Sequence, residues 1–302
     1  MTGFQTGLLL LISIPLSSIG QTKQMALTDL KTLLYSEKEW IKVHTAEFLL
    51  WENCYVEEVR TEFLKEEERF ARIPKYRIGV WRVLAQTAVD KKDKQYWIDK
   101  IIAAYRNPEG KDRLHAIETL AKLQVPVVQD QPEGDKGSFQ LYSLWNYALR
   151  SEQTKQEVKH VLIKDLVSER LTELEMHVTS YILRYIGPLA DDEYMQIEAW
   201  MRKEDMKIAL RSNLLATLLI AGPENQSVSV TRSLKEELYA MRNEGEAIPH
   251  MMMALAQKGD LNDRKIVADL YTAMRDMKSG GYNTDLHATA AYMAFKVLEC
   301  VK

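Results

Sequence analysis

Residues 176–187 read Met-His-Val-Thr-Ser-Tyr-Ile-Leu-Arg-Tyr-Ile-Gly, and their pattern decides the fold. Val178, Ile182 and Ile186 are apolar and recur at helical spacing, and Gly187 follows where a helix can end. Similar short segments begin at Lys42, Arg113 and Asp285. The stretch therefore predicts one helix of an internal repeat.

Eight such segments align when the residue after a leading apolar position is taken as position zero of the repeat. The position-zero residues are His44, Arg77, His115, Tyr142, His177, Arg211, His250 and His287. A repeat period in the thirties, without strand signals, is typical of stacked helical hairpins. More highly charged segments alternate with the eight and are expected to form the outer helix of each hairpin. They cover residues 57–71, 94–105, 156–171, 191–202, 231–242 and 262–277.

This alternation resembles HEAT-like α-solenoid proteins over residues 28–302. The resemblance implies an all-α fold, an elongated right-handed stack of seven to eight helical hairpins. HEAT repeats carry Asp and Arg or Lys at fixed inner-helix positions, whereas position zero of this chain is more often His. Residues 75–86 and 110–121 also resemble exported bacterial helical-repeat segments that accompany, or are fused to, sodium/solute symporters. That second resemblance implies periplasmic handling of carbohydrate-like solutes.

Residues 1–20 have the pattern of a signal peptide. Residues 3–20 carry no charge, and an apolar core of about ten residues is shorter than the roughly 20 that span a bilayer. Ser18 and Gly20 would precede a cleavage before Gln21, although the first six residues lack Lys and Arg. We expect an exported protein, periplasmic or secreted, without a stable membrane span in the mature chain. The alternative is a disordered or buried apolar N-terminus.

The remaining chain divides at a loop rich in Pro and Gly. We expect helical repeats over 21–123, the loop over 124–139, and further repeats over 140–302. A loop of this length is either a linker between two sub-arrays or a binding loop. In an elongated body Cys54 and Cys300 would lie near opposite ends, so two separate thiols are expected.

The charge balance excludes one class of partner. Forty basic and 43 acidic residues give a net charge of −3, and the charges are mixed along the chain. A nucleic-acid partner requires clustered Lys and Arg, and the sequence offers no such cluster.

Seven position-zero residues and two tryptophans are the candidate ligand-binding residues. They are His44, Arg77, His115, His177, Arg211, His250, His287, Trp81 and Trp145. A row of His and Arg along the concave inner-helix surface would suit an anionic ligand, and exposed Trp would suit a glycan. The alternative, packing against the neighbouring repeat, is preferred for both sets because a residue repeated in a repeat protein usually serves the repeat.

No catalytic residue, metal site or cofactor is predicted. His44 with Glu47 and His115 with Glu118 share the spacing His-x-x-Glu, which places both side chains on one helix face. The two pairs lie two repeats apart, about 20 Å if helices pack at 8–10 Å. A shared metal site is therefore excluded unless the stack closes on itself.

The expected function is non-catalytic binding or scaffolding, with a protein or glycan on the concave face and a role in carbohydrate or solute uptake. The alternative is a carbohydrate-active enzyme of the (α/α) type, in which helical hairpins close into a ring. An enzyme should show a deep pocket with convergent carboxylates or His, and a scaffold a broad, shallow groove.

Overall fold

The structure is a computed structural model that describes residues 16–132, 137–168, 170–203, 206–240, 248–278 and 280–298. Within these ranges the chain is all-α, as the sequence predicts, and contains no strand. The helices are α1 Leu16–Ser36, α2 Glu39–Trp51, α3 Val56–Phe70, α4 Tyr76–Gln86, α5 Lys91–Arg106, α6 Arg113–Lys122, α7 Ser138–Ala148, α8 Glu152–Val167, α9 Glu173–Ile186, α10 Asp191–Met201, α11 Ile208–Ala221, α12 Ser227–Ala240, α13 Ile248–Lys258, α14 Arg264–Arg275 and α15 Tyr282–Val297.

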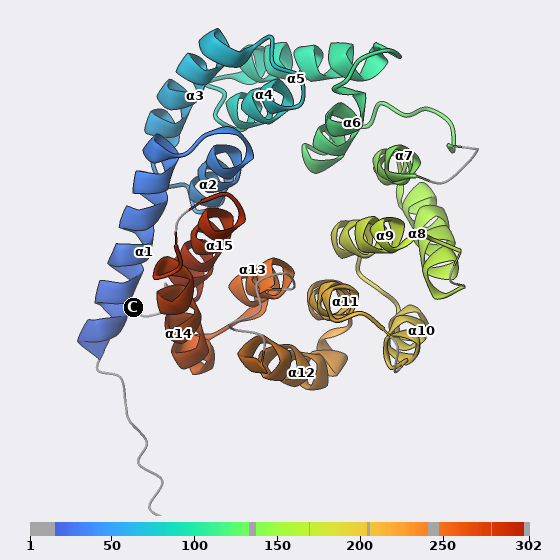
Figure 1. Cartoon of the computed structure of the whole chain (residues 1–302). Helices are drawn as coiled ribbons and strands as arrows, with labels where there is room; N and C mark the ends of the chain where they lie inside the picture. Colours follow the sequence, from blue (N-terminus) through green and yellow to red (C-terminus); the bar gives the residue numbers. More distant parts are fainter. Residues whose placement is uncertain are drawn as a thin grey trace, which may run out of the picture.

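The helices form two concentric layers (Figure 1). The inner layer is α2, α4, α6, α7, α9, α11, α13 and α15, each packed on the next. The outer layer is α1, α3, α5, α8, α10, α12 and α14. The segments aligned by position zero are the inner helices, and the charged segments between them are outer helices. Stacking buries the apolar faces that a single hairpin leaves exposed.

The inner layer closes into a ring, so the expectation of an elongated stack is wrong. The last helix, α15, packs on both α1 and α2 (Figure 1). Phe48 stacks on Tyr292 with ring centroids 4.8 Å apart, and Lys296 Nζ lies 2.8 Å from Glu52 Oε2. Closure buries apolar end faces that an open stack exposes to water, which is favourable in proportion to the area removed.

A second set of contacts across this seam involves α1. Asp29 Oδ2 accepts hydrogen bonds from Tyr271 Oη at 2.6 Å and from His287 Nε2 at 2.9 Å, and Arg275 Nε lies 3.0 Å away. The seam therefore combines aromatic packing with charged hydrogen bonds.

Between α6 and α7 the described residues form no outer helix, and the predicted loop takes its place. The two helices pack directly on each other. Asn146 Oδ1 accepts from the backbone N–H groups of Val127 and Val128, and its Nδ2 donates to Val125 O at 2.8 Å. One side chain thus anchors the first part of the loop on α7, while residues 133–136 lie outside the described residues. The division into two sub-arrays stays a prediction.

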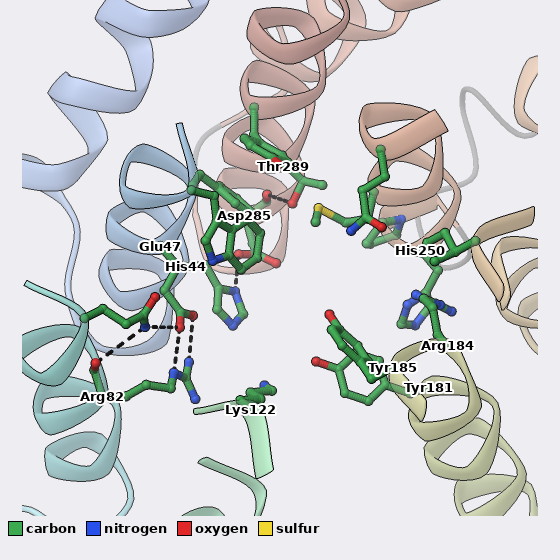
Figure 2. A pocket seen from close by; sticks show the side chains of 18 of the residues that line it. His44, Glu47, Arg82, Lys122, Tyr181, Arg184, Tyr185, His250, Asp285 and Thr289 are labelled. Atoms are coloured by element: carbon green, nitrogen blue, oxygen red, sulfur yellow. Dashed lines mark hydrogen bonds and ion pairs between the residues drawn. The ribbon is translucent and has the colours of Figure 1, made fainter. Parts of the chain in front are cut away.

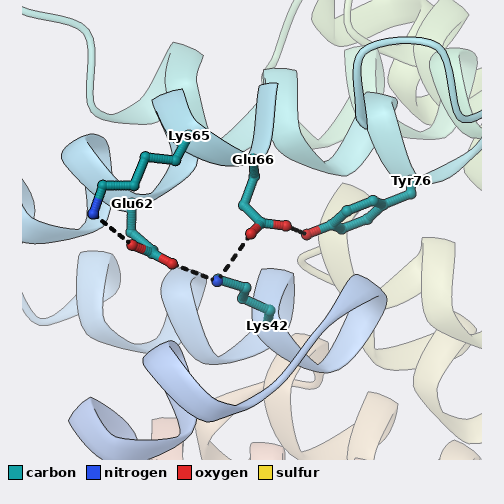
Figure 3. Close-up of polar contacts among 5 residues, drawn as sticks. All are labelled: Lys42, Glu62, Lys65, Glu66 and Tyr76. Atoms are coloured by element: carbon teal, nitrogen blue, oxygen red, sulfur yellow. Dashed lines mark hydrogen bonds and ion pairs between the residues drawn. The ribbon is translucent and has the colours of Figure 1, made fainter. Parts of the chain in front are cut away.

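A buried ion cluster fastens α2 to α3 and α4 (Figure 3). Lys42 Nζ lies 2.7 Å from Glu62 Oε1 and 3.1 Å from Glu66 Oε1. Tyr76 Oη donates to the other Glu66 oxygen, and Lys65 Nζ reaches Glu62 Oε2 at 3.2 Å. Every charge in the cluster has an opposite charge beside it, as buried charges require.

Three expectations about the ends of the chain have different outcomes. Most of the apolar core of the leading segment lies outside the described residues, and the expected cleavage after Gly20 falls within α1. None of the helices in the described ranges combines the length and the apolar character needed to cross a bilayer. Cys300 lies outside the described residues, so the two separate thiols stay a prediction, although the argument from opposite ends no longer holds.

Candidate functional site

The centre of the ring holds a pocket of about 590 Å³, which we call the central pocket (Figure 2). Its walls come from seven inner helices: α2, α4, α6, α9, α11, α13 and α15. The lining residues used below are His44, Glu47, Phe48, Trp51, Arg82, Gln86, Lys122, Tyr181, Arg184, Tyr185, His250, Gln257, Asp285 and Tyr292. Ring closure makes this pocket, because α15 supplies Asp285 and Tyr292 opposite α9.

One wall contains a buried ion pair between α2 and α4. Arg82 donates from Nε and Nη2 to the two carboxylate oxygens of Glu47, each at 2.7 Å. Gln86 Nε2 also donates to Glu47 at 3.0 Å. Burial alone would raise the pKa of Glu47, but the charge and hydrogen bonds of Arg82 outweigh it and lower that pKa. Glu47 is therefore a fixed anion whose oxygens are already occupied.

Beside this pair, α6 contributes a second charged group. Lys122 Nζ lies 2.7 Å from Glu118 Oε1, and His115 Nδ1 lies 3.9 Å from Glu118 Oε2. Burial would raise the pKa of Glu118, but the charges of Lys122 and Arg82 and the hydrogen bonds of Lys122 and His115 hold it far below its usual range.

An imidazole held by a carboxylate lies where α2 meets α15. His44 Nδ1 donates to Asp285 Oδ1 at 2.9 Å, and the His44 side chain is 40% exposed. The carboxylate orients the ring and fixes the proton on Nδ1. Nε2, the other ring nitrogen, is then the basic one.

The opposite wall contains a buried guanidinium on α9, that of Arg184. Its Nη2 donates to Asn213 Oδ1 and, at 3.1 Å, to Asn213 O; its Nε donates to Thr217 Oγ1 at 3.4 Å. Nη1 donates to no described residue. Burial lowers the pKa of Arg184. Asn213 and Thr217 are neutral, so Arg184 lacks a carboxylate partner among the described residues.

The other buried basic residues in the described ranges all have such a partner. Lys42 has Glu62 and Glu66, Arg82 has Glu47, and Lys159 lies 2.8 Å from Glu193. An unpaired buried charge is costly, and proteins neutralise it with a counter-charge or a ligand. Arg184 is the exception, and it lines the central pocket.

A neutral imidazole, that of His250, lies next to Arg184 on this wall. Burial lowers the pKa of His250 to about 3, and the charges of Arg184 and His177 contribute. Tyr181 and Tyr185 lie beside it with ring centroids 4.9 Å apart, and their hydroxyls face the cavity (Figure 2). The wall therefore presents a cation, an imidazole and two phenols to the same space.

The predicted site residues separate into two groups. His44 and His250 line the central pocket, and His115 lines a neighbouring one. The other six predicted residues line neither pocket; they are Arg77, His177, Arg211, His287, Trp81 and Trp145.

Three of these six residues form hydrogen bonds or ion pairs with a neighbouring helix. Arg77 Nε lies 2.8 Å from Asp112 Oδ2, at the start of α6. Asn213 Nδ2 on α11 donates to His177 Nδ1 at 3.2 Å. Arg211 Nε lies 2.5 Å from Glu237 Oε1 on α12. These contacts fit the packing interpretation of position zero.

The remaining three lie in helix–helix contacts. His287 joins the seam through Asp29. Trp81 is buried between α4 and the outer layer, where Lys100 Nζ lies 5.0 Å from its ring centroid. Trp145 is fully buried and packs on Tyr181 and Tyr185 at centroid distances of 5.9 and 5.2 Å.

Sequence reasoning missed most of the pocket, including Arg82, Lys122, Tyr181, Arg184, Tyr185 and Asp285. The sequence suggests only metal binding for Glu47. A signal existed: Arg82 and Arg184 stand within apolar inner helices, in Val-Trp-Arg-Val-Leu and Tyr-Ile-Leu-Arg-Tyr. A lone charge among apolar residues of an inner helix indicates either a buried ion pair or a ligand site.

No metal site emerges from the described part of the chain, where no group of three or more His, Cys, Asp and Glu side chains could hold an ion. The ring does bring His44 and His115 to one pocket, despite the two repeats between them. Glu47, however, is bound by Arg82, and Glu118 by Lys122. The carboxylates of both His-x-x-Glu pairs are therefore committed to cations of the protein.

The sequence matches no protein-family model, no curated protein and no solved structure. The resemblance to symporter-associated repeat segments therefore gains no support.

Proposed function

We propose that the protein binds a small organic anion in the central pocket, with the negative group of the ligand beside Arg184 and His250. The main support for this proposal is the buried Arg184 guanidinium, which has only neutral partners in the described ranges. A bound carboxylate would supply the missing counter-charge through charge-assisted hydrogen bonds. It would also favour the protonated form of His250.

The rest of the pocket indicates the class of anion. Aromatic rings of Phe48, Trp51, Tyr185 and Tyr292 line it, Trp51 and Tyr185 are 46% and 44% exposed, and the tyrosine hydroxyls with Gln257 offer hydrogen bonds. Aromatic rings with a few placed polar groups suit a ligand that has both apolar faces and hydroxyls. We therefore propose a sugar acid, a sugar ring that carries a carboxylate. This sharpens the expected glycan partner and favours it over a protein partner, because the site is a pocket and not a broad groove.

The test is a thermal-shift and calorimetric comparison of D-glucuronate and D-galacturonate with the neutral sugars glucose and galactose. Binding to the folded state adds about 2.7 kcal/mol of stability at a hundredfold excess over Kd. We expect the uronates to shift the transition and the neutral sugars not to. The shift should disappear in Arg184→Gln and weaken in His250→Asn. Arg211→Gln, an exposed arginine outside the pocket, is the matched control. Equal shifts with uronates and neutral sugars would contradict the proposal.

Catalysis on an acidic sugar is the second candidate, and the His44–Asp285 pair favours it. An imidazole oriented by a carboxylate is a common general acid or base. The closed ring is also the arrangement expected of an (α/α) enzyme. Incubation with acidic oligosaccharides, followed by mass spectrometry, tests for turnover. If the wild type forms products and His44→Gln forms none while it still binds glucuronate, the protein is an enzyme. If the wild type leaves the substrate unchanged, the protein only binds the sugar.

The repeat family and the cellular location of the protein are part of the same proposal. We propose that the ring is a HEAT-like array whose first and last hairpins have met. We propose export on the uncharged leading segment, and a role in solute uptake only as what the resemblance of residues 75–86 and 110–121 implies. Cell fractionation of the full chain, with detection of the mature N-terminus, tests export.

A further inference from the structure

A second pocket of about 560 Å³ adjoins the central one, and we call it the side pocket. It lies between α2, α4, α6 and the turn before α4. His44, Arg82 and Lys122 line both pockets. Each pocket alone falls in the range that holds one small ligand, ~300–1,000 Å³. Together they exceed what a single sugar acid fills.

The lining of the side pocket differs from that of the central pocket. Trp40 and Ile73 are 43% and 48% exposed at its edge, so both leave apolar surface open to a ligand. Trp40 packs edge-on against His44, with ring centroids 5.6 Å apart, so the two rings stand at the boundary between the pockets. An exposed indole at the mouth of a pocket is a stacking surface for a ring with an apolar face.

The described charged residues that line the side pocket offer no unpaired buried cation to a second anion, since Arg82, which lines both pockets, is paired with Glu47. Glu39 and Glu118 line it, and Lys122, its neighbouring cation, is already paired with Glu118. Lys75 also lines this space, at the turn before α4. No buried cation without a carboxylate partner faces it among the described residues. A neutral sugar ring therefore suits this pocket better than an acidic one.

We infer that the side pocket is a second subsite and that the ligand is an acidic disaccharide or longer chain. Its acidic unit occupies the central pocket at Arg184, and a neutral unit stacks on Trp40. This inference rests on the proposed binding of a sugar acid. It adds the length of the ligand and the order of its units. The junction between the subsites is His44, the imidazole that Asp285 orients.

The experiment compares D-glucuronate with a disaccharide of glucuronate linked to xylose, by calorimetry on the full chain. We expect the disaccharide to bind about tenfold more tightly, and Trp40→Ala to remove that gain while leaving the Kd of glucuronate unchanged. Ile73→Ala provides a second, milder variant of the same subsite. Tyr96→Ala, an exposed aromatic residue on α5 outside both pockets, is the matched control.

The outcomes separate this inference from the proposed function. If glucuronate binds and the disaccharide binds no more tightly, the second subsite is wrong and the central site stands. The same holds if Trp40→Ala weakens both ligands equally. If neither ligand binds, both proposals fail together. A gain for digalacturonate equal to that for the glucuronate–xylose disaccharide would contradict the neutral second unit.

Discussion

Two buried cations, Lys42 and Arg184, have opposite surroundings in the same ring. Lys42, in the joint between α2 and α3, lies within 3.1 Å of two carboxylates (Figure 3). Arg184, which lies on the wall of the central pocket (Figure 2), has only an amide, a carbonyl and a hydroxyl as acceptors among the described residues. Both side chains are less than one-tenth exposed.

Lys42 is therefore a charge that stabilises the fold, whereas Arg184 is a charge available to a ligand. Two charges removed from water recover the cost only when they face each other with good geometry. The Lys42 cluster meets this condition within the protein. Arg184 does not, so its counter-charge is left to something that enters the pocket. The free energy of unfolding measures the contribution of both cations on one scale.

The largest effect is expected at Lys42. Lys42→Met leaves Glu62 and Glu66 buried without their shared cation, and breaking one side of a buried pair costs about 3–5 kcal/mol. Urea unfolding measures the loss. Lys65→Met is the matched control, because Lys65 is 54% exposed in the same cluster and its removal should cost less than about 1 kcal/mol. Equal losses in the two variants would contradict the comparison.

The second effect is a pH dependence at His250. Its folded pKa, about 3, is below the ordinary 6.5, so the folded protein holds His250 neutral where the unfolded chain binds a proton. Stability should therefore fall as pH decreases below 6.5 and continue to fall toward pH 3. His250→Asn should reduce the loss between pH 7 and 4.5 by about 2 kcal/mol. Unfolding measured across this range checks the value.

Two observations sharpen that experiment. His160 on α8 is exposed, so His160→Asn should leave the slope unchanged. Saturating glucuronate should flatten the slope in the wild type, since an anion beside His250 raises its pKa. If His250→Asn has the same slope of stability against pH as the wild type, the acid sensitivity arises from another group.

The sequence predicted the helices better than the shape they form. Periodicity identifies apolar faces and the repeat, so the inner and outer helices were predictable from segments such as residues 176–187. Closure was not, because a repeat period tells which hairpins are neighbours and says nothing of the small rotation between them. That rotation, accumulated over the chain, brings α15 back to α1 and α2.

The site residues were predicted only in part, because the repeat pattern identifies the inner helices but not which turn of each helix faces the pocket. Position zero lies in the first two turns of each inner helix, where Arg77, His177 and Arg211 bond the neighbouring helix. The pocket is lined further along the same helices: Glu47 stands three residues after His44, and Arg184 stands seven after His177. Residues three or seven apart lie on the same face of a helix. The sequence therefore identified the correct helices and face, but the pocket residues lie one or two turns further along each helix.

An intermediate effect is expected at the seam, where Asp29 has several donors but is partly exposed. Burial alone would raise the pKa of Asp29, but hydrogen bonds from His287 and Tyr271, with the charges of His287 and Arg275, outweigh it and lower that pKa. Its contribution is present above the unfolded pKa near 3.8 and is lost as pH falls through the folded value. Asp29→Asn should cost about 1 kcal/mol at pH 7 and nothing below the folded pKa. Urea unfolding at pH 7 and in strong acid compares the two; a cost independent of pH would contradict an ionic role.

The smallest effect on stability is expected at Arg184, the residue on which function depends most. Arg184→Met leaves no carboxylate behind, because its acceptors are neutral. Thr217 Oγ1 also bonds Ser180, and Asn213 O also accepts from Thr217 Oγ1, so both keep partners. Relief of the buried charge offsets the lost hydrogen bonds, and the net change should be within about 1 kcal/mol.

Glucuronate binding should weaken at least about thirtyfold, since one buried charge partner is worth 2 kcal/mol or more. Unfolding and calorimetry on the same preparation give both numbers. A loss of 3 kcal/mol or more in stability would show that Arg184 holds the ring together as Lys42 does, and the comparison between the two cations would collapse.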